Sequence, residues 1–226
     1  MRLRIVHQTR YQYKKKVHFG PHRLVLRPRE GHDLRVESMI VKTEPEGVLT
    51  WSRDVFGNSI ATVEFEQSAK ELLIESQVTV VRMTPVVKRK PPLAGITPWP
   101  PVYDPLERVA VRAYQRLSYP KDAAAVKAWL ENFRIKKPDY AEDVVRNLNE
   151  YIYDELTYIR REEKGVFTPA QTLQAGGGSC RDLATLLLEA ARSLGIAARF
   201  ASGYLECSAA VLGEASTHAW AEIYHP

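Results

Sequence analysis

The 226-residue sequence lacks the features that mark membrane proteins and metalloproteins. It has no run of about 18 apolar residues, which a membrane-spanning helix requires. Its first residues, MRLRIVHQTRYQY, alternate instead of forming an export signal. It contains no CxxC pair, HExxH motif or EF-hand loop. We therefore predict no membrane contact, no metal and no other cofactor.

Cysteine is also scarce, because only Cys180 and Cys207 are present. Two cysteines in a chain without an export signal favour free thiols and a cytoplasmic location over a disulfide. No internal repeat and no low-complexity tract occurs, which excludes solenoids and long disordered segments. The sequence therefore predicts ordinary folded domains.

Negative charge is under-represented in the first part of the chain. Residues 1–100 hold 17 Lys and Arg against 10 Asp and Glu, whereas residues 101–226 hold 15 against 17. The basic clusters at residues 14–16 and 88–90 are accompanied by no nucleic-acid motif or interleaved aromatic platform. We interpret them as a solvated face and predict no nucleic-acid partner.

Helical periodicity is missing from the first 83 residues, where β-branched or alternating runs are separated by turn residues. In the last run, Leu72, Ile74, Val78 and Val80 are expected to face inward, with Glu75, Gln77 and Thr79 outward. This pattern predicts an antiparallel β-sandwich over residues 1–83. Seven of the fourteen prolines follow in residues 84–106, which we interpret as a linker.

After the linker the apolar period becomes helical. A helix is predicted from Asp122, and another over residues 140–159. The second carries one apolar stripe, formed by Val144, Leu148, Ile152, Leu156 and Ile159.

The stretch GGGSCRDLATLLLEAARSLG, residues 176–195, places Cys180 at the predicted start of a third helix. Ser179 and Asp182 have the spacing of a capping box, and Gly195 is a helix stop. A helix amino terminus favours an anion, so Cys180 is a candidate nucleophile whose own N–H donates to an oxyanion. Two alternatives remain: a small buried cysteine, or a glycine-rich phosphate cradle lacking the usual Lys and Ser/Thr.

A cysteine nucleophile needs a base, and His218 is the best placed of the six histidines. THAWAEIY, residues 217–224, has the alternation of a strand. Ala219, Ala221 and Ile223 would face a core, while His218, Trp220 and Glu222 share the other face. A histidine at the entrance to a strand can face a helix amino terminus.

Three groups of residues together resemble a known family. Residues 168–205 and 217–224 are similar to the core of the bacterial transglutaminase-like superfamily, whose fold is like that of papain. The first 83 residues resemble the β-rich region that precedes this core, especially HRLVLRPR at 22–29 and DVFGNSI at 54–60. The resemblance implies an α+β fold class, with the transglutaminase-like core at residues 107–226.

The resemblance also implies that Cys180 is the nucleophile and His218 the base. The family's third catalytic residue, an aspartate on the next strand, is not in this chain. We expect it beyond Pro226, which would make the core incomplete at its carboxyl end. Gln174, six residues before the cysteine, is a candidate second oxyanion donor by analogy with papain-like spacing, although an ordinary surface glutamine is the simpler interpretation.

These inferences predict a cysteine-dependent acyltransferase or hydrolase that acts on a protein or peptide. An acyl-enzyme on Cys180 would be resolved by water, as in a cysteine protease, or by a lysine amine, as in a transglutaminase. Acetyl transfer on the same two residues is a weaker option. The alternative from another class is a catalytically inactive binding or scaffolding module that retains the fold, with the missing acid as its best support.

Overall fold

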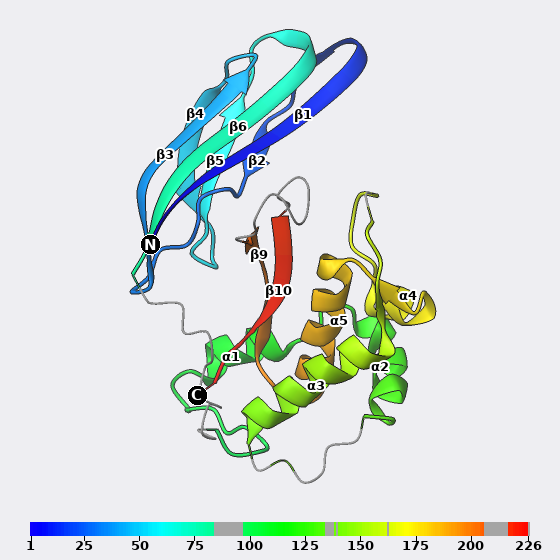
Figure 1. Ribbon diagram of the computed structural model, residues 1–226. Helices are drawn as coiled ribbons and strands as arrows, with labels where there is room; N and C mark the ends of the chain where they lie inside the picture. Colours follow the sequence, from blue (N-terminus) through cyan, green and yellow to red (C-terminus); the bar gives the residue numbers. More distant parts are fainter. Residues whose placement is uncertain (84–96, 134–137, 139, 162, 206–216, 226) are drawn as a thin grey trace. The chain divides into compact units, whose positions relative to one another are not determined.

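The computed structural model describes residues 1–83, 97–133, 138, 140–161, 163–205 and 217–225 (Figure 1). The chain forms two compact units, Met1–Arg89 and Lys90–Pro226. The boundary between the units lies at residues 89 and 90, within the proline-rich segment. Each unit is a separate fold and is described by itself.

Unit 1 consists of two antiparallel three-stranded sheets. One has the order β1-β6-β3, formed by Arg2–His18, Ser68–Arg82 and Leu34–Glu44. The other has the order β2-β5-β4, formed by His22–Leu24, Ser59–Glu64 and Val48–Arg53. Every strand pair within them is antiparallel. The predicted antiparallel β architecture of this region is confirmed.

The core of unit 1 follows from the alternation along β6. Its predicted inward residues are all buried, namely Leu72, Ile74, Val78 and Val80, and the three predicted outward residues are partly exposed. Leu72 and Ile74 pack with Val63 of β5, so apolar side chains from both sheets meet. Burying each such side chain contributes roughly 1.5–3 kcal/mol, and a one-residue slip would expose the whole set.

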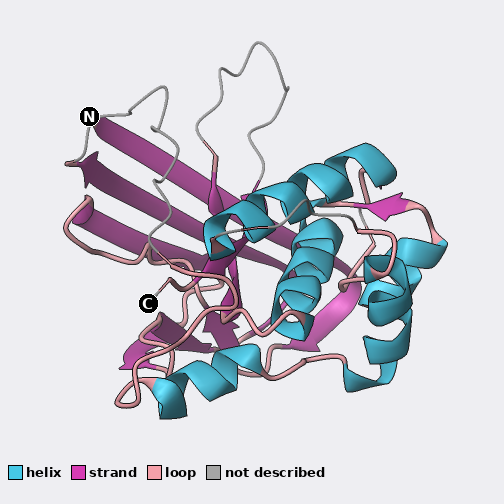
Figure 2. Cartoon of the chain, turned by 90° about the horizontal axis from the view of Figure 1, so that it is seen from below, coloured by secondary structure: helices cyan, strands magenta, loops and turns pink. Residues whose placement is uncertain are grey.

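Unit 2 is built around the helix α5, Cys180–Ser193. This helix packs against α2, α3 and α4 and against the antiparallel pair β9 and β10. Figure 2 distinguishes the helices from the strands by colour. The elements before α5 are α1 Arg108–Gln115, the 3-10 turn η1 Pro120–Asp122, α2 Ala123–Leu130, α3 Ala141–Glu155, β7 Thr157–Tyr158, α4 Pro169–Gln174 and β8 Gly177–Gly178; those after it are β9 Ala198–Tyr204 and β10 Thr217–Ile223. Helices and strands together give the predicted mixed α+β class.

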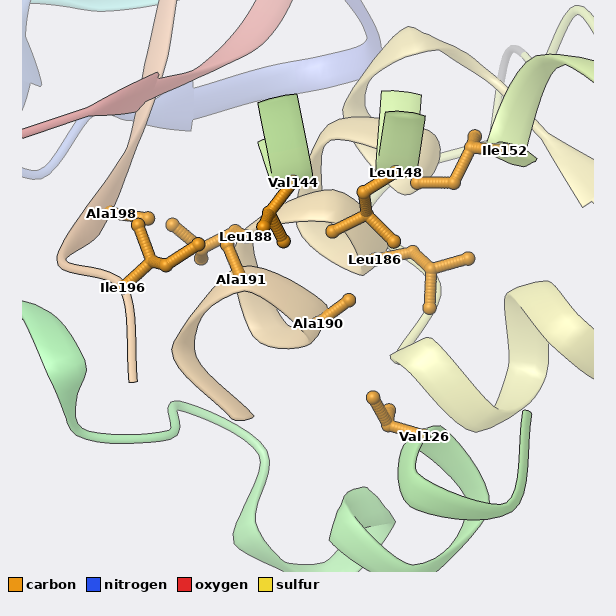
Figure 3. Packing of buried hydrophobic residues seen from close by; sticks show 10 residues of the cluster. All are labelled: Val126, Val144, Leu148, Ile152, Leu186, Leu188, Ala190, Ala191, Ile196 and Ala198. Carbon is orange, nitrogen blue, oxygen red and sulfur yellow. The ribbon is translucent and has the colours of Figure 1, made fainter. Parts of the chain in front are cut away.

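The core of unit 2 lies between α3, α5 and the β9–β10 pair (Figure 3). Val144, Leu148 and Ile152 form the stripe of α3 that was predicted, because residues four apart share one helix face. They pack in one cluster with Leu186 and Ala190 of α5. This packing holds α5 in place along its length.

The prediction that the helix of α3 continues to residue 159 is wrong. The helix ends at Glu155, and Leu156 already has extended dihedral angles. The N–H groups of Thr157 and Ile159 donate to the carbonyl oxygens of Gly176 and Gly178, at 3.0 and 2.9 Å. Pairing with a distant segment therefore outcompetes the helical periodicity, and it brings residues 157–159 beside the start of α5.

Two general findings concern the described ranges only. None of the helices there has both the length and the apolar composition needed to cross a membrane. No group of three or more His, Cys, Asp and Glu side chains in the same ranges is arranged to hold a metal ion.

Candidate active site

Helix α5 begins at Cys180, as predicted. Ser179 is the extended residue before the helix and forms a capping box with Asp182. The Asp182 carboxylate accepts hydrogen bonds from the N–H of Ser179 at 2.8 Å and from its hydroxyl at 2.7 Å. Cys180 is thus the first helical residue, and its thiol is free and partly exposed.

The backbone around the thiol offers open hydrogen-bond donors. The N–H groups of Asp182 and Leu183 donate to the Ser179 carbonyl oxygen at 2.9 and 3.0 Å. Those of Cys180 and Arg181 have no acceptor within the described part of the chain. Open amides at a helix amino terminus attract negative charge, so the sulfur lies where an anion is stabilised.

Asp182 is fully buried, and its charge is balanced by Arg161. Nη1 of Arg161 lies 2.9 and 2.7 Å from the two carboxylate oxygens, and the N–H of Phe167 donates to Oδ1 at 2.8 Å. Burial by itself would raise the pKa of Asp182. The hydrogen bonds from Arg161, Phe167 and Ser179 outweigh burial and hold this pKa below its ordinary value.

The three glycines before Ser179 are required for packing and backbone shape. Gly176 has a φ of +66°, which L side chains rarely adopt. A Cβ on Gly177 would lie 2.0 Å from the carbonyl oxygen of Thr157, and one on Gly178 would lie 2.7 Å from the Cβ of Asp182. The sequence did not reveal the close contact of Gly177, because no local pattern links it to Thr157.

Gly177→Ala is expected to lower the free energy of unfolding of unit 2 by about 3 kcal/mol, because the added methyl group displaces the Thr157 backbone. Urea unfolding followed by circular dichroism measures the change. Gly20→Ala, in unit 1, is the control for the substitution itself: nothing lies within 4 Å of its added Cβ, so the stability of unit 2 is expected to stay unchanged. Equal stability of the two variants would contradict the close packing of β7 and β8.

His218 lies at the second residue of β10, opposite Gly203 of β9. The alternation predicted for this strand is present: Ala219 is buried, and Ala221 and Ile223 pack against the core of unit 2. The rings of His218 and Trp220 are stacked, with centroids 6.4 Å apart. His218 itself is partly exposed.

The topology of unit 2 brings the starts of α5 and β10 to the same end. Ala191 and Ile223 belong to one packed cluster near the opposite ends of these elements. Cys180 lies eleven residues before Ala191 on a helix and His218 five residues before Ile223 on a strand, which is about 16 Å in each case. Figure 1 shows α5 and β10 running along each other.

The two predicted catalytic side chains are not hydrogen-bonded to each other. No bond between the Cys180 sulfur and the His218 ring occurs among the described residues. Gln174 is the exposed last residue of α4, which packs against α5 and β8. Cys207 lies outside the described residues.

The carboxylates of Glu222 and Asp182 are both engaged by other groups and make no hydrogen bond to His218 among the described residues. Glu222 shares the strand face of His218 but is bound to Arg199, with 2.6 Å between Oε2 and the guanidinium. Asp182 is held by Arg161, Phe167 and Ser179. Sequence reasoning missed Arg161, because no local pattern links it to a helix that starts about twenty residues later.

Unit 2 is an α+β fold in which a cysteine begins a helix and a histidine lies on an antiparallel strand pair that packs against this helix. Unit 1, with its antiparallel sheets, precedes it in the chain. Residues 127–226 match the model of the transglutaminase-like superfamily, and residues 3–81 match that of the bacterial transglutaminase-like N-terminal region. The two matches together cover most of the chain. The chain thus matches both regions of bacterial transglutaminase-like proteins, the N-terminal region and the core.

The chain is similar to proteins of bacteria, and it spans about three quarters of their length. Uncharacterized proteins of Mycobacterium bovis and Mycobacterium tuberculosis are 28% identical over 242 residues, which covers all of this chain and 74% of each relative. A crystal structure from Cytophaga hutchinsonii, described as that of a "putative cysteine protease", has a TM-score of 0.72 at 17% identity. That match covers 99% of this chain and 73% of the other, and it shows a shared fold.

Proposed function

We propose that the protein catalyses thiol-dependent acyl transfer on peptide or glutamine amides, with Cys180 as nucleophile and His218 as base. The observation that carries this proposal is the partly exposed free thiol at the first residue of α5, next to two open N–H donors. The match to the transglutaminase-like superfamily supports a thiol-dependent enzyme. The finer assignment of chemistry to residues is our own.

In the proposed mechanism His218 takes the proton of the Cys180 thiol, and the thiolate attacks the carbonyl carbon of the amide. The carbonyl oxygen becomes an oxyanion that accepts hydrogen bonds from the N–H groups of Cys180 and Arg181. The C–N bond then breaks, His218 protonates the departing amine, and a thioester remains on the sulfur. Gln174, on the neighbouring helix, is a further candidate donor to the oxyanion.

The thioester can react in two ways, and both use Cys180 and His218. Water, deprotonated by His218, releases a carboxylic acid and restores the thiol, which is hydrolysis. A lysine amine in place of water gives a new amide, which is transamidation. Both reactions require Cys180 to stay reduced, so we infer a reducing compartment such as the cytoplasm. Because the bond attacked is an amide, we infer a protein or peptide substrate.

The distance between Cys180 and His218 is expected to shorten when substrate binds. Hydrogen bonds between a nucleophile and its base are often long in the free enzyme and tighten in the complex. The packing of α5 against β10 supports this approach, since the two residues lie at the starts of these elements.

Trapping the acyl-enzyme tests the proposal. The protein is incubated with an activated ester of a short glutamine-containing peptide, with and without a fluorescent primary amine, and is analysed by peptide mass spectrometry. We expect the acyl mass on Cys180, its absence in Cys180→Ala, and release as acid or as the amine adduct. Acylation of Cys207 at the same rate as Cys180 would contradict an activated nucleophile.

The alternative function, an inactive binding module, is favoured by one observation: the carboxylates of Asp182 and Glu222 are each engaged by an arginine. Alkylation by iodoacetamide at pH 6 separates the two functions. An enzyme is expected to react much faster at Cys180 than at Cys207, in a way that depends on His218. Equal and slow reaction of both thiols supports the binding module.

A further inference from the structure

A negative charge lies close to the proposed nucleophile. Asp182 follows Cys180 by two residues in the first turn of α5, and its carboxylate is completely buried. Like charges disfavour each other, and burial weakens the screening by water. Without compensation, this carboxylate would oppose both a thiolate on Cys180 and an oxyanion at the neighbouring N–H groups.

The same carboxylate nevertheless shapes the site. It accepts the N–H of Ser179, the residue before the helix, while the N–H groups of Cys180 and Arg181 stay open within the described part of the chain. It also holds the N–H of Phe167 on the adjoining segment. The site therefore needs the hydrogen bonds of Asp182 but not its charge.

Arg161 supplies the opposite charge and is fixed in place. Its guanidinium contacts both carboxylate oxygens, and its side chain is only 9% exposed. The guanidinium carbon lies 3.4 Å from the centre of the Phe167 ring, so the group stacks on an aromatic face. Burial, the stacked ring and the hydrogen bonds of Nη1 to both carboxylate oxygens hold the guanidinium beside Asp182.

We propose that Arg161 is a positioning residue for Cys180 that neutralises Asp182, so that the carboxylate can organise the start of α5 without opposing negative charge on the sulfur. The inference rests on the proposed role of Cys180 as nucleophile. It adds to the site a residue from the segment after β7, nineteen positions before α5.

Other charged groups near the helix start do not provide this compensation. They are Arg181 on α5, Glu163 on the segment after β7, and His218 on β10. The Arg181 guanidinium donates to the carbonyl oxygens of Arg161 and Glu163, at 3.4 and 2.6 Å. The Glu163 side chain is 75% exposed and lies 3.8 Å from Arg161, so water screens it.

The pH dependence of alkylation tests the proposal, because the thiolate is the reactive form. The second-order rate for iodoacetamide at Cys180 is measured from pH 4 to 10 in the whole chain, by mass spectrometry of the peptide that contains it. Arg161→Gln is expected to move the midpoint up by about one pH unit, and Asp182→Asn to move it down. The double variant is expected to return near the wild-type midpoint.

This pattern of opposite signs separates charge from structure, since loss of structure would move both single variants in the same direction. Arg161→Lys is expected to stay close to the wild type, and Lys164→Gln, at an exposed position on the same segment, is the matched control. If Arg161→Gln does not fold, the other two variants still test the proposal. It predicts a lower midpoint for Asp182→Asn and a midpoint near that of the wild type for the double variant.

Wild-type midpoints in all folded variants, or shifts of the same sign in both single variants, would overturn the role of Arg161. Alkylation needs no substrate, so this result is independent of the acyl-enzyme experiment. If no thioester forms but the alkylation midpoints of the two single variants shift in opposite directions, the proposed function is refuted and the charge compensation by Arg161 is supported.

Discussion

Asp182→Ala is expected to lower the free energy of unfolding of unit 2 by about 3–5 kcal/mol, the usual cost of removing one partner from a buried ion pair. The substitution leaves the guanidinium of Arg161 buried without a counter-charge and removes the acceptor of the Ser179 and Phe167 N–H groups. Chemical denaturation, followed by a signal specific for unit 2, measures the loss.

The matched control is Asp154→Ala, at an exposed position on α3. It is expected to change stability by less than about 0.5 kcal/mol. A loss at Asp182 no larger than that at Asp154 would show that the Arg161–Asp182 pair contributes nothing to the start of α5.

The stabilisation by Asp182 is also expected to depend on pH, with a defined sign. Its pKa is lower in the folded protein than in the unfolded chain, since the hydrogen bonds it accepts outweigh the effect of burial. The stabilisation is therefore complete above the unfolded pKa of about 3.9 and is lost as the pH falls through the folded pKa. The stability difference between wild type and Asp182→Asn should shrink over that acidic range and stay constant above about pH 5.

His218→Ala is expected to lower the turnover of an amide substrate by about 10²–10⁴-fold, the contribution of a positioned acid and base. The variant can neither take the thiol proton nor protonate the leaving amine, whereas the open N–H groups of α5 remain. Single-turnover kinetics should place the loss in thioester formation rather than in substrate binding.

His32→Ala is the matched control, because His32 is an exposed histidine of unit 1. It is expected to leave turnover unchanged. Full activity of His218→Ala, together with an inactive Cys180→Ala, would mean that another group is the base. That result would support Cys180 as the nucleophile and contradict the role of His218 as the base.

Much of the architecture could be predicted because local residues encode it. The two-residue alternation of β6 and β10 places alternate side chains on opposite faces, and the apolar side chains must be buried. The start of α5 at Cys180 was predictable for a similar reason. The capping interaction between Ser179 and Asp182 spans only three residues.

Long-range pairing explains what the sequence pattern did not predict. The apolar stripe of α3 continues past Glu155, yet Thr157 and Ile159 pair with the glycines before α5 and end the helix. The close approach that requires Gly177 likewise depends on Thr157, which lies twenty residues earlier. Local periodicity carries no information about such partners.

By itself, the sequence determined the alternating strands β6 and β10, the apolar face of α3 and the place of Cys180 at a helix start, because these depend on periodicity and on neighbours a few residues apart. Only the tertiary structure decided where α3 ends, why the three glycines are needed and which cation balances Asp182. Those features join segments about twenty residues apart, and their energies depend on burial, close packing and charge, which arise once the chain is folded.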